Sequence, residues 1–225
     1  MMKIEPIAKI YTDFDNKFGV PRQSTLVEEL KGKIVFEKEY AVSEAVRGLE
    51  DFSHIWIIWE FDKAKSDTWH PTVRPPRLGG NERVGVFATR SPFRPNSLGL
   101  SCVKLDKVAI ENNCPVLYVS GVDMVNGTPI YDIKPYLPYV DSHSDATGGF
   151  ADEKKDYALQ VQDDAHLLDK LDKDKQTAVI KILQSDPRPS YQIDEERVYG
   201  FTFGGYEIKF KVNGSFLTVV EVENE

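Results

Sequence analysis

Two arginines in a proline-rich loop are the residues of this chain best suited to bind an anionic group. Arg90 and Arg94 follow the apolar run 86–88, which is typical of the end of a buried strand. Pro92 and Pro95 hold φ near about −65° and exclude a helix through the turn. A stiff loop loses little conformational entropy on binding, and a planar guanidinium fits carboxylates, phosphates and base edges. The pattern predicts an anion-binding loop.

The charge distribution supports a local anion site. Residues 74–96 contain one acidic residue, Glu82, in a chain whose formal net charge is −8. The same stretch contains five arginines: Arg74, Arg77, Arg83, Arg90 and Arg94. An acidic chain that concentrates arginine in this way favours one binding site over general affinity for polyanions. The alternative is that the arginines are dispersed over the fold and pair with nearby acids.

Composition excludes several other classes of protein. With 225 residues, 41% hydrophobic and 28% charged, the chain is typical of a soluble globular protein. Residues 1–6 lack the apolar core of a signal peptide, and the longest aromatic and apolar run, 55–59, is too short to span a membrane. Cys102 and Cys114 cannot form a disulfide framework or a four-cysteine site, and the histidines lack metal-ligand spacing. We therefore expect a cytoplasmic protein without a metal, and a buried Cys102 thiol.

The first 140 residues predict a mainly β fold. One short helix is predicted at 43–47, and no strand alternates with a long helix, which argues against a doubly wound sheet and for a small closed or nearly closed β-barrel. The chain also lacks the Gly-x-Gly-x-x-Gly fingerprint of a Rossmann cofactor site. The candidate strands are rich in β-branched and aromatic residues and lie at 4–11, 33–40, 54–61, 83–89, 98–108 and 116–122.

A change of composition after Asp141 predicts a second domain. Residues 141–149 are polar and glycine-rich, as in a linker or surface loop. We therefore divide the chain into a barrel domain, 1–141, and a smaller α+β domain, 142–225.

A helix and a hairpin are predicted in this second domain. Apolar residues on one face predict the helix between Leu168 and Leu183, ending before Pro187. Strict alternation over 206–212, followed by Asn213-Gly214, predicts a β-hairpin with a type I′ turn.

Several separate motifs together resemble the TrmO (TsaA-like) family. The resemblance covers residues 4–141 and continues more weakly through 186–191, a motif that two-domain bacterial members share. The motifs that carry it are Val20-Pro21-Arg22-Gln23, Arg47 to His54, Arg74 to Gly80, Gly85 to Asn96 and Gly127 to Tyr136.

The resemblance implies a function and its partners. Members are S-adenosylmethionine-dependent tRNA methyltransferases that act on the exocyclic N6 amine of threonylcarbamoyl-adenosine at position 37, beside the anticodon. It therefore implies a non-Rossmann β-barrel enzyme that binds S-adenosylmethionine and the tRNA anticodon loop. It also implies a homodimer without a metal, in which the second domain assists tRNA binding.

The resemblance also implies site residues. It places cofactor contacts at Pro21, Arg22, Gln23, Asp62, Lys63, Arg90, Leu100, Asn126, Gly127, Thr128 and Pro129. Asp62-Lys63 departs from the family, which commonly has a histidine there, so a contact at this point involves the backbone or a changed side chain.

Catalytic and tRNA-contacting residues are expected close to the cofactor loop. Methyl transfer to a weakly nucleophilic amine needs positioning and a group that accepts an N–H hydrogen bond, and Asp132 and Tyr136 are the candidates. The alternatives are that Asp132 caps a turn and that Tyr136 only packs. Arg94, Asn96 and Lys134 are expected to contact the tRNA backbone or the threonylcarbamoyl carboxylate.

A second interpretation is a non-catalytic barrel. Such a protein would bind a small nucleoside-like or anionic ligand in a regulatory role, and the net charge of −8 favours it because nucleic-acid-binding proteins are usually basic. The arginine cluster and the number of matching motifs outweigh this argument.

Overall fold

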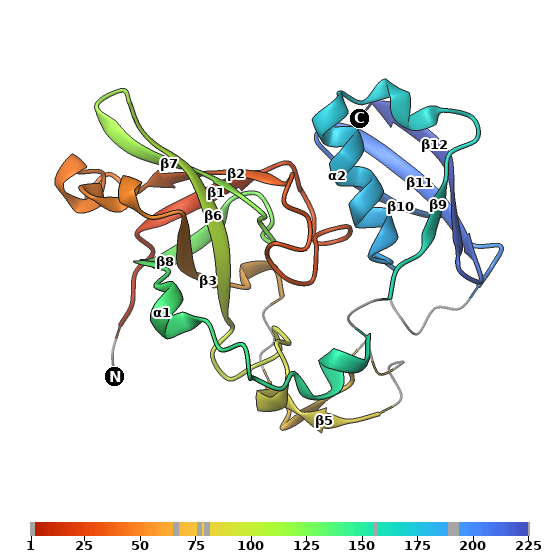
Figure 1. Ribbon diagram of the computed structural model, residues 1–225, viewed down its shortest axis with the longest axis horizontal. Helices are drawn as coiled ribbons and strands as arrows, with labels where there is room; N and C mark the ends of the chain where they lie inside the picture. The colour runs from red at the N-terminus through yellow and green to blue at the C-terminus, as the bar shows by residue number, and fades with distance from the viewer. Residues whose placement is uncertain are drawn as a thin grey trace.

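A closed β-barrel is the largest element of the computed structural model, which describes residues 3–64, 68–75, 78, 82–154, 157–188 and 194–224 (Figure 1). Its strands follow the order β1-β2-β7-β6-β3-β8, and every neighbouring pair is antiparallel. They are β1 (Ala8–Thr12), β2 (Lys31–Phe36), β3 (His54–Glu60), β6 (Leu98–Glu111), β7 (Cys114–Ser120) and β8 (Thr128–Pro135). The predicted mainly β barrel is therefore confirmed.

Alternating side chains give the barrel an apolar interior and a mixed outer face. In β3, Ile55, Ile57 and Trp59 are buried, whereas the residues between them are partly exposed. This period of two is what a strand with one face on the core requires. The outer face of β3 therefore carries His54, Trp56, Ile58 and Glu60 toward the surface.

The structure corrects two predictions in the barrel half. Residues 83–89 are not a buried strand: β5 (Val84–Gly85) pairs only with β4 (Thr72–Val73), and a 3₁₀ turn follows at Val86–Ala88. Pro92 and Pro95 lie too close behind to allow a longer strand there. Conversely, the resemblance placed Thr128 and Pro129 in a loop, but they begin β8, the strand that closes the barrel.

A second sheet with one helix forms the C-terminal unit, residues 157–224. It has the order β10-β11-β12-β9, and β9 is parallel to β12. Its elements are β9 (Gln160–Gln162), α2 (Lys173–Gln184), β10 (Tyr199–Phe203), β11 (Tyr206–Asn213) and β12 (Phe216–Asn224). The predicted hairpin is confirmed, but only Gly214 has a positive φ, of 57°, and the two-residue loop is Gly214-Ser215. The positive φ at the first loop residue is the pattern of a type II′ turn and not of type I′.

The predicted helix around 168–183 is split in two. Leu167–Lys170 forms a 3₁₀ turn, and α2 begins after Asp172, whose carboxylate accepts a hydrogen bond from the Lys175 N–H at 2.9 Å. An aspartate at the N-cap satisfies a backbone donor that the helix leaves free, so the helix starts at this residue.

The remaining elements are short. They are α1 (Pro138–Asp141) and 3₁₀ turns at Ser43–Val46, Leu49–Asp51, Asp62–Ala64 and Gly149–Lys154. None of the helices in the described ranges has the length and apolar character that a membrane span requires.

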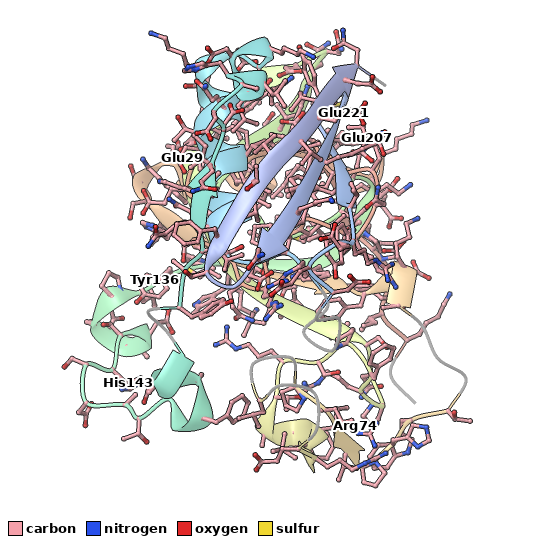
Figure 2. The ribbon with its side chains drawn as sticks, turned by 90° about the vertical axis from the view of Figure 1, so that its right-hand side faces the viewer. Glu29, Arg74, Tyr136, His143, Glu207 and Glu221 are labelled. Carbon is pink, nitrogen blue, oxygen red and sulfur yellow. The ribbon has the colours of Figure 1, made fainter. Side chains whose placement is uncertain are left out.

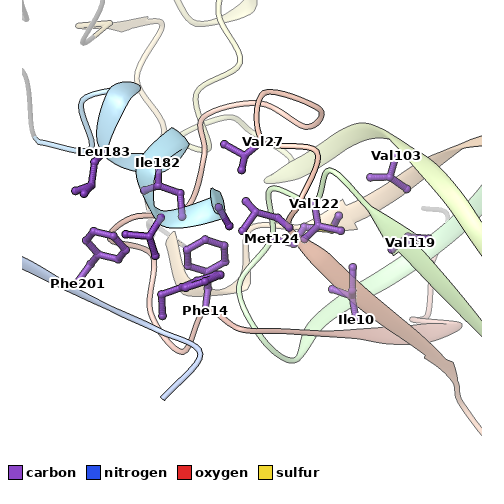
Figure 3. Close-up of a cluster of buried hydrophobic side chains, with 14 of the residues drawn as sticks. Ile10, Phe14, Val27, Val103, Val119, Val122, Met124, Ile182, Leu183 and Phe201 are labelled. Carbon is purple, nitrogen blue, oxygen red and sulfur yellow. The ribbon is translucent and has the colours of Figure 1, made fainter. Parts of the chain in front are cut away.

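One hydrophobic core runs from the barrel into the C-terminal unit. Phe14, in the β1–β2 connection, is fully buried, and its ring centroid lies 5.1 Å from that of Phe203. Figure 3 shows Phe14 between Phe201 on the sheet side and Met124 on the barrel side. The division of the chain into domains at 141 and 142 stays a prediction, and the two units share their core.

Candidate functional site

The β1–β2 connection, residues 13–30, covers the end of the barrel. The Thr25 N–H donates to the Gly121 carbonyl at 2.8 Å, and the Gly121 N–H donates to the Leu30 carbonyl at 2.8 Å. These bonds tie both halves of the connection to the residue that follows β7. They also place Pro21, which is buried, and the exposed Arg22 at this end.

Gln23 and Arg90 meet here although they are far apart in the sequence. The Arg90 guanidinium donates from Nη1 to the Gln23 side-chain oxygen. Arg90 is exposed, so the rest of its donor fork faces solvent. The structure thus brings together two of the residues that the sequence assigned to the cofactor.

Asp123 is a functional candidate that the sequence analysis missed. Its Oδ1 accepts a hydrogen bond from the Ser101 hydroxyl at 2.7 Å, and the Ser101 oxygen accepts one from the Trp59 indole N–H at 2.9 Å. Burial raises the pKa of Asp123 to about 6, while the hydrogen bond from Ser101 and the charge of Arg90 act in the opposite direction. A carboxylate that titrates near neutrality beside an arginine is typical of a functional site. The signal in the sequence was an acid within the apolar run 121–125, directly after a strand.

Asn126 and Gly127 form the turn that precedes β8, and backbone hydrogen bonds hold this turn against β1 and the residues that follow it. The Asn126 N–H donates to the Phe14 carbonyl at 2.7 Å, and Gly127, with φ of 79°, donates to the Ile10 carbonyl at 2.8 Å. Thr128 is 2% exposed and its hydroxyl donates to the Val125 carbonyl at 2.7 Å. The Thr128 side chain is therefore a structural contact, and Asn126, Gly127 and Pro129 are the more accessible residues of this group.

The outer face of the barrel gathers a second group of sequence-predicted residues. Register places Leu100 of β6 beside Ile58 of β3, and Ile58 beside Asp132 of β8. Leu100 is 58% exposed, which is unusual for a leucine on a strand. The next residue of β6, Ser101, points inward and bonds to Asp123. Strand β6 therefore carries Leu100 on the outer face and Ser101 toward Asp123.

Asp132 and Lys134 form an ion pair on this face. The Asp132 Oδ2 lies 2.8 Å from the Lys134 Nζ, and its Oδ1 accepts the N–H of Ile133 at 2.9 Å. The register of β8 against β3 shifts next to Asp132, between Ile58 and Trp59. The carboxylate thus stabilises an irregular strand and remains half-exposed, with room to accept another hydrogen bond.

Tyr136 packs against two aromatic side chains of β3. Its ring centroid lies 5.8 Å from that of Trp56 and 6.2 Å from that of His54. Cys102 pairs with Trp56 on the same face and is half-buried, not fully buried as expected. Burial raises the pKa of its thiol, with a smaller contribution from Asp141, which makes the thiol a poor nucleophile at neutral pH.

Asp62 and Lys63 follow β3 at the barrel end. They lie in a 3₁₀ turn and pair with each other at 3.2 Å. The preceding Phe61 N–H donates to the Ser97 carbonyl at 2.8 Å, which holds this turn beside the start of β6. Nearby, the Tyr131 hydroxyl donates to Glu60 at 2.7 Å, and burial together with that bond raises the pKa of Tyr131 to about 12.

The arginine-rich segment forms a separate lobe (Figure 2). Figure 2 shows Arg74 at the opposite end of the molecule from Glu207 and Glu221, which lie on the C-terminal sheet. Arg83 donates to the Thr72 hydroxyl at 3.0 Å, and Arg94 donates to the Thr89 carbonyl at 2.8 Å. Arg77 lies outside the described residues.

Arg83, Arg90 and Arg94 are thus held by neutral groups, and none of the three forms a salt bridge within the ranges that the structure describes. Arginine salt bridges occur elsewhere, at Arg47 and Arg188. For Arg83, Arg90 and Arg94, the alternative of ion pairs with nearby acids is therefore not found among the described residues. One nitrogen of the Arg94 guanidinium donates to a carbonyl of its own loop. Asn96, two residues further on, is exposed.

The described residues offer no group of three or more histidine, cysteine, aspartate or glutamate side chains that could hold a metal ion. The candidate site is therefore built from guanidinium, carboxylate, amide and backbone groups. Such a set suits an organic ligand with separate positive and negative charges.

Models of two protein families match the chain. The tRNA-methyltransferase O N-terminal domain matches residues 9–142, and the TrmO C-terminal domain matches residues 153–225. Together they span the barrel and the C-terminal unit.

Known proteins are similar over the whole chain. The tRNA (adenine(37)-N6)-methyltransferase of Escherichia coli is 38% identical, over 98% of this chain and 97% of that protein. A putative S-adenosylmethionine-dependent methyltransferase of Pseudomonas aeruginosa, RcsF, is 39% identical over 88% of this chain and 87% of that protein. The crystal structure of TrmO from Pseudomonas aeruginosa superposes with a TM-score of 0.76 at 28% identity, covering 100% of both chains.

Proposed function

The chain belongs to the tRNA-methyltransferase O family, and we propose that it methylates the exocyclic N6 amine of threonylcarbamoyl-adenosine at position 37 of tRNA. It is an S-adenosylmethionine-dependent methyltransferase built on a β-barrel, as its motifs predicted. The observation that best supports a cofactor site at the barrel end is the meeting of Gln23, Arg90 and Asp123 there.

The residues at the barrel end fit S-adenosylmethionine. When bound, this cofactor supplies a methyl group on a positively charged sulfonium. The remaining donors of Arg90 suit the carboxylate of the cofactor. The Asp123 carboxylate lies close enough to Arg90 to interact with its charge, and it provides a negative charge for the positively charged part of the cofactor. The adenine edge is placed beside Gln23, whose side-chain amide keeps one donor and one lone pair after its bonds with the Arg22 carbonyl and Arg90, and beside Gly127, whose N–H is bonded to the Ile10 carbonyl.

We assign the chemistry to the outer face beside this loop. Asp132 accepts an N–H hydrogen bond from the amine and stabilises the positive charge that develops on it. Lys134, already paired with Asp132, and Asn96 contact the tRNA backbone or the threonylcarbamoyl carboxylate. Arg94 contributes through its remaining donors, and Tyr136 orients the base through the aromatic cluster with Trp56.

Charge segregation supports the tRNA partner despite the acidic total of −8. Arg74 of the arginine-rich segment lies away from the C-terminal sheet, whose unit contains more acidic than basic residues (Figure 2). We propose a cytoplasmic homodimer in which two such segments flank one anticodon loop, because counterion release from few arginines gives only weak binding in a monomer. Sedimentation with and without tRNA tests this arrangement.

The decisive experiment compares two tRNA substrates. Purified protein with S-adenosylmethionine and a chelator is expected to methylate tRNA that carries threonylcarbamoyl-adenosine, and to leave the same tRNA with unmodified adenine unchanged. Mass spectrometry of the digested nucleosides gives the result. Equal methylation of both tRNAs would limit the function to adenine 37, and no S-adenosylmethionine binding in calorimetry would favour the regulatory barrel.

Arg90→Ala tests the cofactor site within this proposal. Loss of a charged contact is expected to weaken S-adenosylmethionine binding by about 2 to 5 kcal/mol. Arg83→Ala is the matched control, since Arg83 lies in the same segment and, among the described residues, donates to the Thr72 hydroxyl and not to Gln23. Unchanged affinity in Arg90→Ala would move this arginine to the RNA side or to a structural role.

A further inference from the structure

The C-terminal unit holds the connection that carries Pro21, Arg22 and Gln23. The Gly204 N–H donates to the Asp13 carbonyl at 2.9 Å near the start of the connection, and Lys181 of α2 pairs with Glu29 at 2.5 Å near its end. Figure 1 shows this connection between the barrel and α2. Residues 13–30 are thus a bridge between the two units and not a free loop.

Arg22 makes a direct contact at the centre of this bridge. Its Nη2 lies 3.5 Å from the carbonyl oxygen of Asp186 and 3.3 Å from that of Arg188. Both acceptors belong to the turn that follows α2. Two carbonyls from the C-terminal unit therefore orient the guanidinium of a residue in the cofactor motif.

The turn from Asp186 to Arg188 is itself rigid. Arg188 donates from Nε and Nη2 to the two carboxylate oxygens of Asp186, at 2.8 and 2.9 Å, and the Tyr157 hydroxyl adds a hydrogen bond at 3.1 Å. The side chains of Arg188 and Asp186 are only 14% and 15% exposed. Asp186 has φ of 54°, a backbone conformation that aspartate tolerates better than most residues.

This arrangement fixes carbonyl groups that would otherwise point in many directions. A bidentate arginine–aspartate pair is the strongest and most directional ion pair available to a protein, and partial burial protects it from screening by salt. The guanidinium of Arg188 also lies 6.0 Å from the centroid of the Tyr199 ring in β10, which ties the turn to the sheet.

We propose that the Asp186–Arg188 turn is a positioning element that holds Arg22, and with it the cofactor loop, in the conformation that binds S-adenosylmethionine. The cofactor part of this inference rests on the proposed function. It gives the C-terminal unit a role at the cofactor site, in addition to any contact with tRNA. Because Asp186 and Arg188 act through Arg22, they change the affinity for the cofactor and not the chemical step.

The test uses the full chain and two readouts. In Arg188→Ala, hydrogen exchange of the backbone amides of residues 22–24 without ligand is expected to become about tenfold faster, since the constraint on the loop is lost. The dissociation constant for S-adenosylmethionine is expected to rise about tenfold, the usual size for a lost hydrogen bond to a charged group. Turnover at saturating cofactor should stay unchanged.

Three variants separate positioning from general stability. Arg197→Ala is the matched control, because Arg197 also lies over the Tyr199 ring, at 5.3 Å, but has no contact with Asp186 in the described residues. Asp186→Asn keeps an acceptor and a residue that tolerates positive φ, so it should largely rescue the loop relative to Asp186→Ala. Arg22→Ala combined with Arg188→Ala should be no worse than either alone.

The outcomes discriminate clearly. Unchanged exchange of residues 22–24 in Arg188→Ala, or additive losses with Arg22→Ala, would overturn the inference even if the melting temperature fell. If the wild-type protein binds no S-adenosylmethionine, the proposed function fails, and the exchange measurement alone then decides whether the turn positions Arg22.

Discussion

Two aspartates near the proposed cofactor differ sharply in their surroundings. Asp123 is partly buried beside the β1–β2 connection and bonded to Ser101, whereas Asp132 is half-exposed and paired with Lys134. Burial favours the neutral form of Asp123, and its charge is therefore maintained at a cost in stability. A residue kept at such a cost is a candidate for function.

Asp123→Asn is expected to stabilise the protein and weaken cofactor binding. Because the folded-state pKa of about 6 is above the ordinary aspartate value of 3.8, the wild type loses stability as pH rises from about 4 to 6. Asparagine does not titrate and still accepts the Ser101 bond, so its advantage should grow over that range and level off near roughly 3 kcal/mol above it. Urea unfolding at pH 4.5 and 7.5 measures this difference. If the variant differs from the wild type by the same free energy of unfolding at both pH values, the carboxylate of Asp123 is not desolvated and the prediction is wrong.

Asp132→Asn separates chemistry from scaffold. Asparagine retains an acceptor oxygen for the Ile133 N–H but removes the negative charge, so turnover should fall on the order of 100-fold with cofactor affinity nearly intact. Asp132→Ala should be no less damaging. Early melting of both variants, with normal turnover of the folded fraction, would instead make Asp132 a residue that stabilises the strand irregularity.

At the scale of elements, the centre of the site was harder to predict than the strands around it. Alternation in β3 and β6 is a property of neighbouring residues, so the sequence predicted both strands. The contact of Gln23 with Arg90 and the chain from Trp59 to Asp123 join distant segments, and no local pattern indicates them. The motif Gly85 to Asn96 revealed Arg90, but Asp123 lies outside all the motifs, shortly before the one that begins at Gly127.

Strand β8 shows a second limit of local patterns. The resemblance placed residues 126–129 in a loop and no strand was predicted after 122, yet Thr128–Pro135 pairs with both β3 and β1. Pro129 faces outward beside the short β1, where the loss of one ladder donor is tolerated. Closure of the barrel overrides the local preference, because it gives every neighbouring strand edge a partner.

Gly99 in β6 makes the inner part of the site possible. A Cβ at this position would lie 2.3 to 2.7 Å from atoms of the Trp59 indole, which is 5% exposed and bonded to Ser101. Gly99→Ala is therefore expected to destabilise the protein by about 1 to 3 kcal/mol and to weaken cofactor binding by displacing the chain to Asp123. Gly85→Ala is the control, since nothing lies within 4 Å of a Cβ there. Equal melting temperatures of the two variants would show that Trp59 yields freely.

At the scale of the whole molecule, the question is whether the barrel and the C-terminal unit unfold together. The sequence predicted separable domains, because the polar stretch 141–149 looks like a linker. The structure adds an apolar contact that this pattern does not reveal: Phe14 packs on Phe203, and a Cβ at Gly19 would lie 2.5 Å from the Phe201 ring. Loops buried between two units carry no periodicity, so such contacts escape prediction.

Phe203→Ala tests this coupling with a built-in probe. All three tryptophans, Trp56, Trp59 and Trp69, lie in the first 70 residues, so tryptophan fluorescence reports only on the barrel half. Truncating a buried phenylalanine costs about 3 to 5 kcal/mol, which for a chain of this size lowers the melting temperature by about 6 to 20 °C. If the shared core makes unfolding cooperative, the fluorescence transition shifts by this amount although the substitution is in β10.

Phe216→Ala, at a 44% exposed position of β12, should leave the transition in place. A fluorescence transition that stays fixed in Phe203→Ala, while circular dichroism shows earlier loss of the C-terminal sheet, would mean that the barrel unfolds independently of the C-terminal unit.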